Sequence, residues 1–249
     1  MNKPLACATV LAVALAVAVP FLAGAAGETG NVITYSTGKC FGAAGADGPW
    51  NAVKTGDPVA DNSYLKTEAE SKLEVTLPDG SVIRLGDNTV FMLESQKKAK
   101  ETGMSFSVIL GKAWAKVRKV TTGNTFEVKT KTAVAGVRGT VFSVMAQKDA
   151  STVVKVFEGL VAVNNKPALD SIEAAEKAQA AKKGERVQVS GPKEISKRAW
   201  EEMIAKAMRM VMVAANGEIT EPLAFDLEVE KKDDWVVWNM ARDAALKSQ

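Results

Sequence analysis

The stretch TAVAGVRGTVFSV, residues 132–144, holds two glycines with an arginine between them, followed by alternating apolar and polar residues. Gly136-Val137-Arg138-Gly139 fits either a ligand-binding loop or a tight β corner, because glycine adopts positive φ and allows close backbone approach. The alternation predicts a strand over Thr140–Val144, with Phe142 facing the core. A guanidinium folded inward at a corner donates several hydrogen bonds. We therefore favour an internal brace over an anion or partner contact for Arg138.

The same unit of strand, glycine and strand recurs on both sides of this stretch. Leu73–Leu77 alternates cleanly, and Pro78-Asp79-Gly80 then supplies the residues of a tight turn. Further glycine corners are expected at 111, 159 and 184, at irregular spacings that do not fit a solenoid. Many short strands with glycine corners predict a mainly β fold, an all-β roll or sandwich spanning about 31–190.

Helices are expected only late in the chain. An alanine-rich charged segment, 170–183, ends before a glycine and predicts an exposed helical insertion between two late strands. Residues 191–249 predict a helical C-terminal extension of two helices. The first is expected over 192–215, where apolar residues recur three or four apart and four methionines lie close together.

The second helix of the extension is expected over Asp233–Lys247, with acidic residues in its first turn. Trp235 and Trp238 share one face of this helix. We interpret them mainly as a clamp onto the β domain, and keep partner contact or sugar stacking as alternatives. We interpret the methionine-bearing helix mainly as packed on the β domain, and keep partner binding and self-association into a homo-oligomer as alternatives.

The N-terminus predicts export. Lys3 is followed by the uncharged run Leu5–Val19, then Pro20 and the small residues Ala23-Gly24-Ala25. This order is typical of a secretory signal peptide, residues 1–25, cleaved near Ala25. An uncleaved anchor is the alternative, because the run is long enough to span a bilayer. We expect a periplasmic or secreted protein without a stable membrane span after cleavage.

Composition excludes several classes of function. The net charge is only +3, from 32 basic and 29 acidic side chains, so no nucleic-acid partner is expected. Histidine is absent from the sequence, which excludes Ser-His and Cys-His couples and imidazole metal sites. We predict no catalytic residue, no cofactor and no metal, and thus no enzyme. Cys40, the one cysteine left after cleavage, is expected to be a partly buried spectator.

Several motifs, in order and approximate spacing, resemble the FecR domain from about Trp50 to Val189. They are Leu77-Pro78-Asp79-Gly80-Ser81, Gly111-Lys112-Ala113, Val137-Arg138-Gly139-Thr140-Val141-Phe142 and Val156-Phe157-Glu158-Gly159-Leu160-Val161. The resemblance implies an all-β extracytoplasmic domain. Its motif positions, which we interpret as structural, are Asp79, Gly80, Gly111, Arg138, Gly139, Thr140, Phe142, Glu158 and Gly159.

The resemblance also frames the expected function. In the family's namesake, a similar domain relays occupancy of an outer-membrane iron-siderophore receptor to a sigma factor. Here only Met1-Asn2-Lys3 precedes the apolar run, so we expect a stand-alone exported domain without the cytoplasmic anti-sigma segment. The predicted function is a non-enzymatic module that binds an envelope protein or polymer. The alternative is an accessory component of cell-surface signalling that works with a separate membrane anti-sigma protein.

Overall fold

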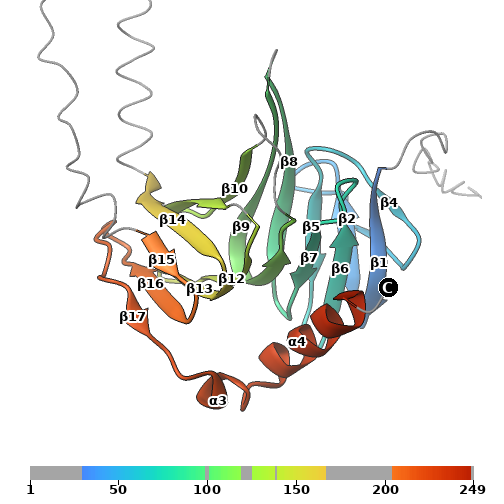
Figure 1. Cartoon of the computed structure of the whole chain (residues 1–249). Coiled ribbons are helices and arrows are strands. Elements are labelled where there is room, and N and C mark those ends of the chain that lie inside the picture. The colour runs from blue at the N-terminus through green and yellow to red at the C-terminus, as the bar shows by residue number, and fades with distance from the viewer. Residues whose placement is uncertain (1–29, 99–100, 119–124, 138, 167–203, 248–249) are drawn as a thin grey trace, which may run out of the picture.

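Alternating apolar and polar residues divide the chain into short strands, whose apolar faces pack together as two sheets (Figure 1). The computed structural model describes residues 30–98, 101–118, 125–137, 139–166 and 204–247. The expected signal peptide (1–25), Arg138 and the expected helical insertion (170–183) lie outside these residues. The predicted mainly β fold is confirmed.

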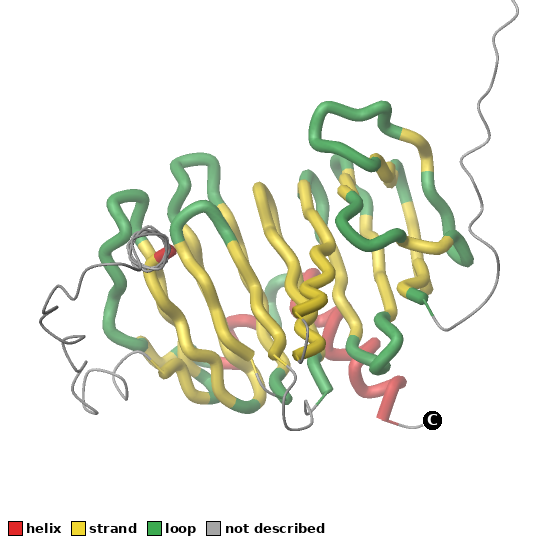
Figure 2. Tube along the Cα trace, turned by 90° about the horizontal axis from the view of Figure 1, so that it is seen from above, coloured by secondary structure: helices red, strands yellow, loops and turns green. Residues whose placement is uncertain are grey.

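The described elements follow one another along the molecule, joined by corners and turns (Figure 2). They are β1 (Asn31–Thr37), β2 (Cys40–Ala43), β3 (Asn51–Ala52), β4 (Pro58–Val59), β5 (Tyr64–Thr67), β6 (Lys72–Thr76), β7 (Val82–Leu85), β8 (Val90–Lys98), β9 (Glu101–Lys116), β10 (Thr125–Lys129), β11 (Ala133–Val137), β12 (Val141–Ala146), β13 (Thr152–Glu158), β14 (Leu160–Asn165), β15 (Ile204–Lys206), β16 (Arg209–Val213), β17 (Leu223–Ala224), α3 (Leu227–Glu230) and α4 (Asp234–Lys247).

Strand pairing defines the two sheets. Sheet A has the order β4-β1-β6-β7-β9-β12-β13-β16-β17. Sheet B has the order β3-β2-β5-β8-β9-β10-β11-β14-β15. The long strand β9 belongs to both sheets, and only its pairing with β10 is parallel.

Glycines mark two of the corners where the chain passes from one sheet to the other. Strand β9 changes sheet at Gly111, which has φ +94° and whose added Cβ would lie 2.6 Å from the Cα of Thr89. Gly159, with φ +86°, separates β13 in sheet A from β14 in sheet B. Positive φ and close backbone approach both require glycine at such positions. Corners were expected at both residues.

The core lies between the sheets and is built from their inward alternate residues. Leu73, Val75 and Phe142 are all at most 1% exposed, as the alternation predicted. Aromatic rings in sheet B pack in series, with the centroids of Phe106 and its neighbour Phe91 5.2 Å apart. Cys40 is 3% exposed, and burial raises the pKa of its thiol. Its expected role as a buried spectator agrees with this position.

The helix expected over 192–215 is wrong in the part that the structure describes. Residues 204–206 form β15, which pairs with β14, and residues 209–213 form β16, which pairs with β13. Apolar residues occupy most positions from 203 to 213, so the helical and the strand periods both fit the sequence. The unpaired edge of β13 decides the outcome, because its backbone groups need partners. The β structure therefore continues past the expected boundary at residue 190.

The described helices are the two near the C-terminus, α3 and α4. Asp226 caps α3, its carboxylate accepting a hydrogen bond from the backbone N–H of Glu228. The terminal helix α4 agrees with the helix expected over Asp233–Lys247 and packs against the outer face of sheet A (Figure 1). Within the described ranges, neither helix has the length and apolar character needed to cross a membrane.

Candidate functional site

The residues of the FecR-like motifs lie in turns and corners. The carboxylate of Asp79 accepts hydrogen bonds from the backbone N–H and the hydroxyl of Ser81, each 2.8 Å long, within the β6–β7 turn. Gly80 follows with φ +79°. These hydrogen bonds close the turn. The outer face of sheet A is formed by the strands on either side of the turn and not by the turn itself.

Two of the motifs meet in space. An added Cβ on Gly159 would lie 2.6 Å from Cγ2 of Thr140 and 2.8 Å from the carbonyl oxygen of Gly139. Strand pairing also places Val141 opposite Glu158. The corner before β12 thus packs directly on the corner after β13. We continue to interpret these motif positions as structural.

The most unusual chemistry lies elsewhere, on the outer face of sheet A. Glu74, Arg84 and Trp114 occupy one row across β6, β7 and β9. All three are at most 4% exposed, although their strand positions point away from the core between the sheets. Arg84 Nε donates a 2.5 Å hydrogen bond to Oε2 of Glu74. Buried charges of this kind persist only when they are paired.

Helix α4 supplies the remaining partners of this row. Arg84 Nη1 donates to Oδ1 of Asp243 at 2.7 Å, and Trp114 Nε1 donates to Oδ2 of the same carboxylate at 2.9 Å. Lys116 Nζ donates to the backbone carbonyl of Asp243 at 2.9 Å. One carboxylate therefore joins the helix to two neighbouring strands.

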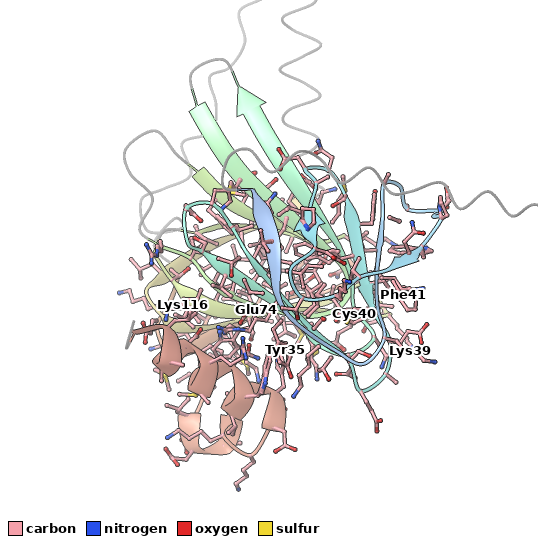
Figure 3. All side chains as sticks on the ribbon, turned by 90° about the vertical axis from the view of Figure 1, so that its right-hand side faces the viewer. Tyr35, Lys39, Cys40, Phe41, Glu74 and Lys116 are labelled. Atoms are coloured by element: carbon pink, nitrogen blue, oxygen red, sulfur yellow. The ribbon has the colours of Figure 1, made fainter. Side chains whose placement is uncertain are left out.

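Arg242 of α4 closes the network from the other side. Its Nε and Nη2 donate to the two oxygens of Glu74 at 2.9 and 2.8 Å, and Thr34 donates a further 2.8 Å bond. Burial by itself raises the pKa of Glu74, but the hydrogen bonds from Arg242, Arg84 and Thr34 outweigh it and lower that pKa to about 2. Figure 3 shows Tyr35, Glu74 and Lys116 on the side of the sheet that faces the helix.

The two tryptophans complete the covered half of the face. The indoles of Trp235 and Trp238 are stacked with centroids 5.5 Å apart, and Trp235 is only 6% exposed. Nζ of Lys112 lies 5.4 Å from the ring centroid of Trp235, and Nζ of Lys72 lies 4.8 Å from the ring centroid of Trp238. Both rings therefore contact the sheet, as a clamp requires, and their use as partner contacts stays a prediction.

The other half of the same face is covered only in part: Val141 and Phe157 are buried in the cluster with Trp235, whereas the far ends of the strands are less buried. Met145, Val153 and Met212 are aligned across β12, β13 and β16, and we call them the methionine face. Met145 is 44% exposed and Met212 is 41% exposed. Lys155, which donates to Glu230 of α3 at 2.6 Å, forms a border between this face and the C-terminal segment.

The sequence contains a pattern that predicts part of the charged row, by which we mean the row of Glu74, Arg84 and Trp114. The β6–β7 turn is centred on Asp79, so an antiparallel hairpin places Glu74 directly opposite Arg84. Asn239 and Asp243 follow Trp235 at intervals of four, which continues the tryptophan face of the helix with polar residues. Strand alternation alone places Glu74 on the face of its strand that points away from the core, where contact with solvent is expected.

The described charged groups of the site pair with one another across the sheet and α4. Among the described residues, no group of three or more His, Cys, Asp or Glu side chains is placed to hold a metal ion. The charged groups of the row are hydrogen-bonded to one another and to α4, except that Nη2 of Arg84 is buried without a hydrogen-bond partner among the described residues. What the face offers a partner is apolar surface.

Comparisons with known proteins agree with the architecture. Residues 63–162 match the model of the family described as FecR protein. Two crystal structures of a candidate anti-sigma factor from Parabacteroides distasonis ATCC 8503, at 1.65 and 2.50 Å resolution, are similar to this chain with 23% identity and a TM-score of 0.44. The match covers 66% of this chain and 60% of that one. A comparison with curated proteins gives no match.

The matched segment includes the β6–β7 turn, the Gly111 corner and the paired corners around Thr140 and Gly159. It also includes all three residues of the charged row, Glu74, Arg84 and Trp114. The helix that covers this row lies beyond the matched segment. The similarity of this chain to the FecR family therefore extends over residues 63–162.

Proposed function

We propose that this protein is a non-enzymatic, exported FecR-domain module that binds a partner protein through the methionine face. The observation that carries the proposal is the row of apolar side chains on β12, β13 and β16, in which Met145 and Met212 are exposed and Val153 is half-buried. Methionine and valine side chains aligned in this way form an adaptable apolar contact surface.

The half of sheet A that α4 covers indicates what kind of element binds to the methionine face. Three adjacent strands, spaced about 4.8 Å apart, present a strip about 10 Å wide, which matches the diameter of an α-helix. Helix α4 occupies the neighbouring strip of the same face through Trp235 and Val236. The partner element is therefore an amphipathic helix that lies beside α4, with its apolar stripe on the methionines.

The test is site-specific photo-crosslinking in cells, with the reactive amino acid at position 145 or 212. The matched control position is Leu160, which is 52% exposed on β14 of sheet B. We expect one defined protein to crosslink from 145 and 212 and not from 160. Purified, it should bind the wild-type chain and lose at least ten-fold in affinity for Met145→Glu. Equal labelling from all three positions would refute this surface.

A second candidate function is favoured by the FecR domain itself. The protein would act in cell-surface signalling, as an accessory that works with a separate membrane anti-sigma protein. The supporting observation is the family match over residues 63–162. Deleting the gene should then change the transcripts that depend on one sigma factor, and an unchanged set of sigma-dependent transcripts would exclude this role.

A further inference from the structure

A cavity of about 430 Å³ lies at the β1 end of the sandwich, away from the methionine face. It is lined by β2, β5 and the connections that carry β3 and β4. Its apolar wall includes the buried side chains of Ile33, Val59 and Leu65, with Val53 partly buried beside them. A volume of this size with mainly apolar walls is typical of a site for a small organic molecule.

The charged groups of the lining are acidic. Asp57 and Asp61 both line the cavity, and none of the described lining residues is a lysine or arginine. Oδ2 of Asp57 accepts a 2.9 Å bond from the backbone N–H of Lys54. Within the described ranges, neither carboxylate forms a salt bridge. Each therefore keeps acceptor capacity for a cation.

Buried contacts hold Asp61 in place. Asn31 is 5% exposed, and its Nδ2 donates to Oδ1 of Asp61 at 3.1 Å and to the carbonyl of Val59 at 3.2 Å. Lys66 lies on β5, which lines the cavity. Its Nζ is 4.9 Å from the ring centroid of Trp50. The acidic charge of the cavity is thus oriented by the fold and not neutralised by this neighbouring lysine.

We propose that this cavity binds a small organic cation with an aliphatic body, such as an alkylammonium compound. The ammonium group would bind between Asp57 and Asp61, where its hydrogens find charged acceptors. The alkyl chain would lie on Ile33, Val59 and Leu65, where each buried methylene group adds favourable transfer free energy. A carboxylate-bearing ligand of the same length is rejected by like charge.

The test compares three probes of equal chain length, n-hexylammonium, n-hexanol and n-hexanoate, by calorimetry and by methyl NMR shifts of Val53, Val59 and Leu65. We expect n-hexylammonium to bind at least ten-fold more tightly than n-hexanol, with n-hexanoate weaker still. Raising the salt concentration should weaken n-hexylammonium alone. Binding of none of the probes, or equal binding of all three, would overturn the proposal.

Two variants locate the site. Asp61→Asn replaces an exposed side chain and keeps an acceptor for Asn31, so we expect folding to persist and the preference for n-hexylammonium to disappear. Ala60→Trp should fill the cavity and abolish binding of n-hexanol as well. Asp47→Asn, an exposed residue that does not line the cavity, is the matched control. Equal effects of Asp61→Asn and Asp47→Asn would refute the assignment.

Discussion

The two halves of the outer face of sheet A differ in the type of side chain they carry and in how far these side chains are buried. Over β6, β7 and β9, charged and aromatic side chains are buried under α4 and paired with it. Over β12 and β16, the side chains of Met145 and Met212 remain more than 40% exposed. A polar row tolerates burial only when every charge has a partner, whereas an apolar row tolerates exposure but gains by being covered. The first half therefore joins α4 to the sheet, and the second carries the face that we propose binds a partner.

The largest expected effect follows from removing the fully buried cation. Arg84→Met leaves Glu74 and Asp243 buried without it, and we expect the free energy of unfolding to fall by about 3–5 kcal/mol. Urea unfolding followed by tryptophan fluorescence measures this. Arg242→Met is the matched control, because that side chain is 31% exposed and its loss should be clearly milder. Equal losses for both variants would contradict a special role for the buried row.

The next largest effect is expected from acid, which should weaken the half covered by α4 and not the methionine face. The folded-state pKa of Glu74 is about 2, below its ordinary value of 4.5. The stabilisation is therefore fully present above about pH 4.5 and is lost as the pH falls through 2. The lost stability is on the order of 3 kcal/mol.

Glu74→Gln provides the comparison for this pH dependence. The variant should be less stable at neutral pH, and its stability should fall less steeply between pH 5 and pH 2, measured by urea unfolding at each pH. A slope identical to that of the wild type would show that other carboxylates carry the acid sensitivity. Substitutions in the methionine face should leave the slope unchanged, because none of its three side chains titrates.

A smaller effect is expected at the border between the halves. Lys155 pairs with Glu230, and both side chains are partly buried, 28% and 14% exposed. Lys155→Met should lower the free energy of unfolding by about 1 kcal/mol. The matched control is Lys231→Met, whose partner Glu228 is 76% exposed and whose loss should be barely measurable. Thermal unfolding distinguishes the two, and a larger loss for Lys231→Met would reverse the expected order.

The smallest change in stability should come from the methionine face. Met145→Ala and Met212→Ala should each alter the free energy of unfolding by no more than about 0.5 kcal/mol, because both side chains are over 40% exposed. The same variants should weaken binding of the crosslinked partner. Destabilisation of more than about 2 kcal/mol would mean that these methionines belong to the packed structure and not to a binding surface.

The comparison also shows where sequence reasoning succeeds. Leu73, Val75 and Phe142 alternate with polar neighbours, and a period of two can bury only one side of a strand in the core. Gly111 and Gly159 were identifiable as corners because few other residues combine positive φ with close backbone approach. Such local rules do not depend on what packs against the far face of the sheet.

The candidate site could not be predicted by the same rules. Burial of Glu74 and Arg84 depends on α4, which is more than 150 residues away in sequence from its partner Arg84. The helix expected over 192–215 is wrong over residues 204–213 for a related reason, since a nearly continuous apolar run fits both periods until the edge of β13 selects the strand. Arg138, the residue on which the sequence argument concentrated, lies outside the described residues.

For this protein, the sequence by itself determined the β class, the corners and the inward-facing residues, because these follow from local periodicity and glycine geometry. Only the tertiary structure decided which half of sheet A is covered, which charges are buried, and where a cavity remains. Those features depend on contacts between distant segments, and the free energy of such contacts belongs to the pair and not to either segment alone.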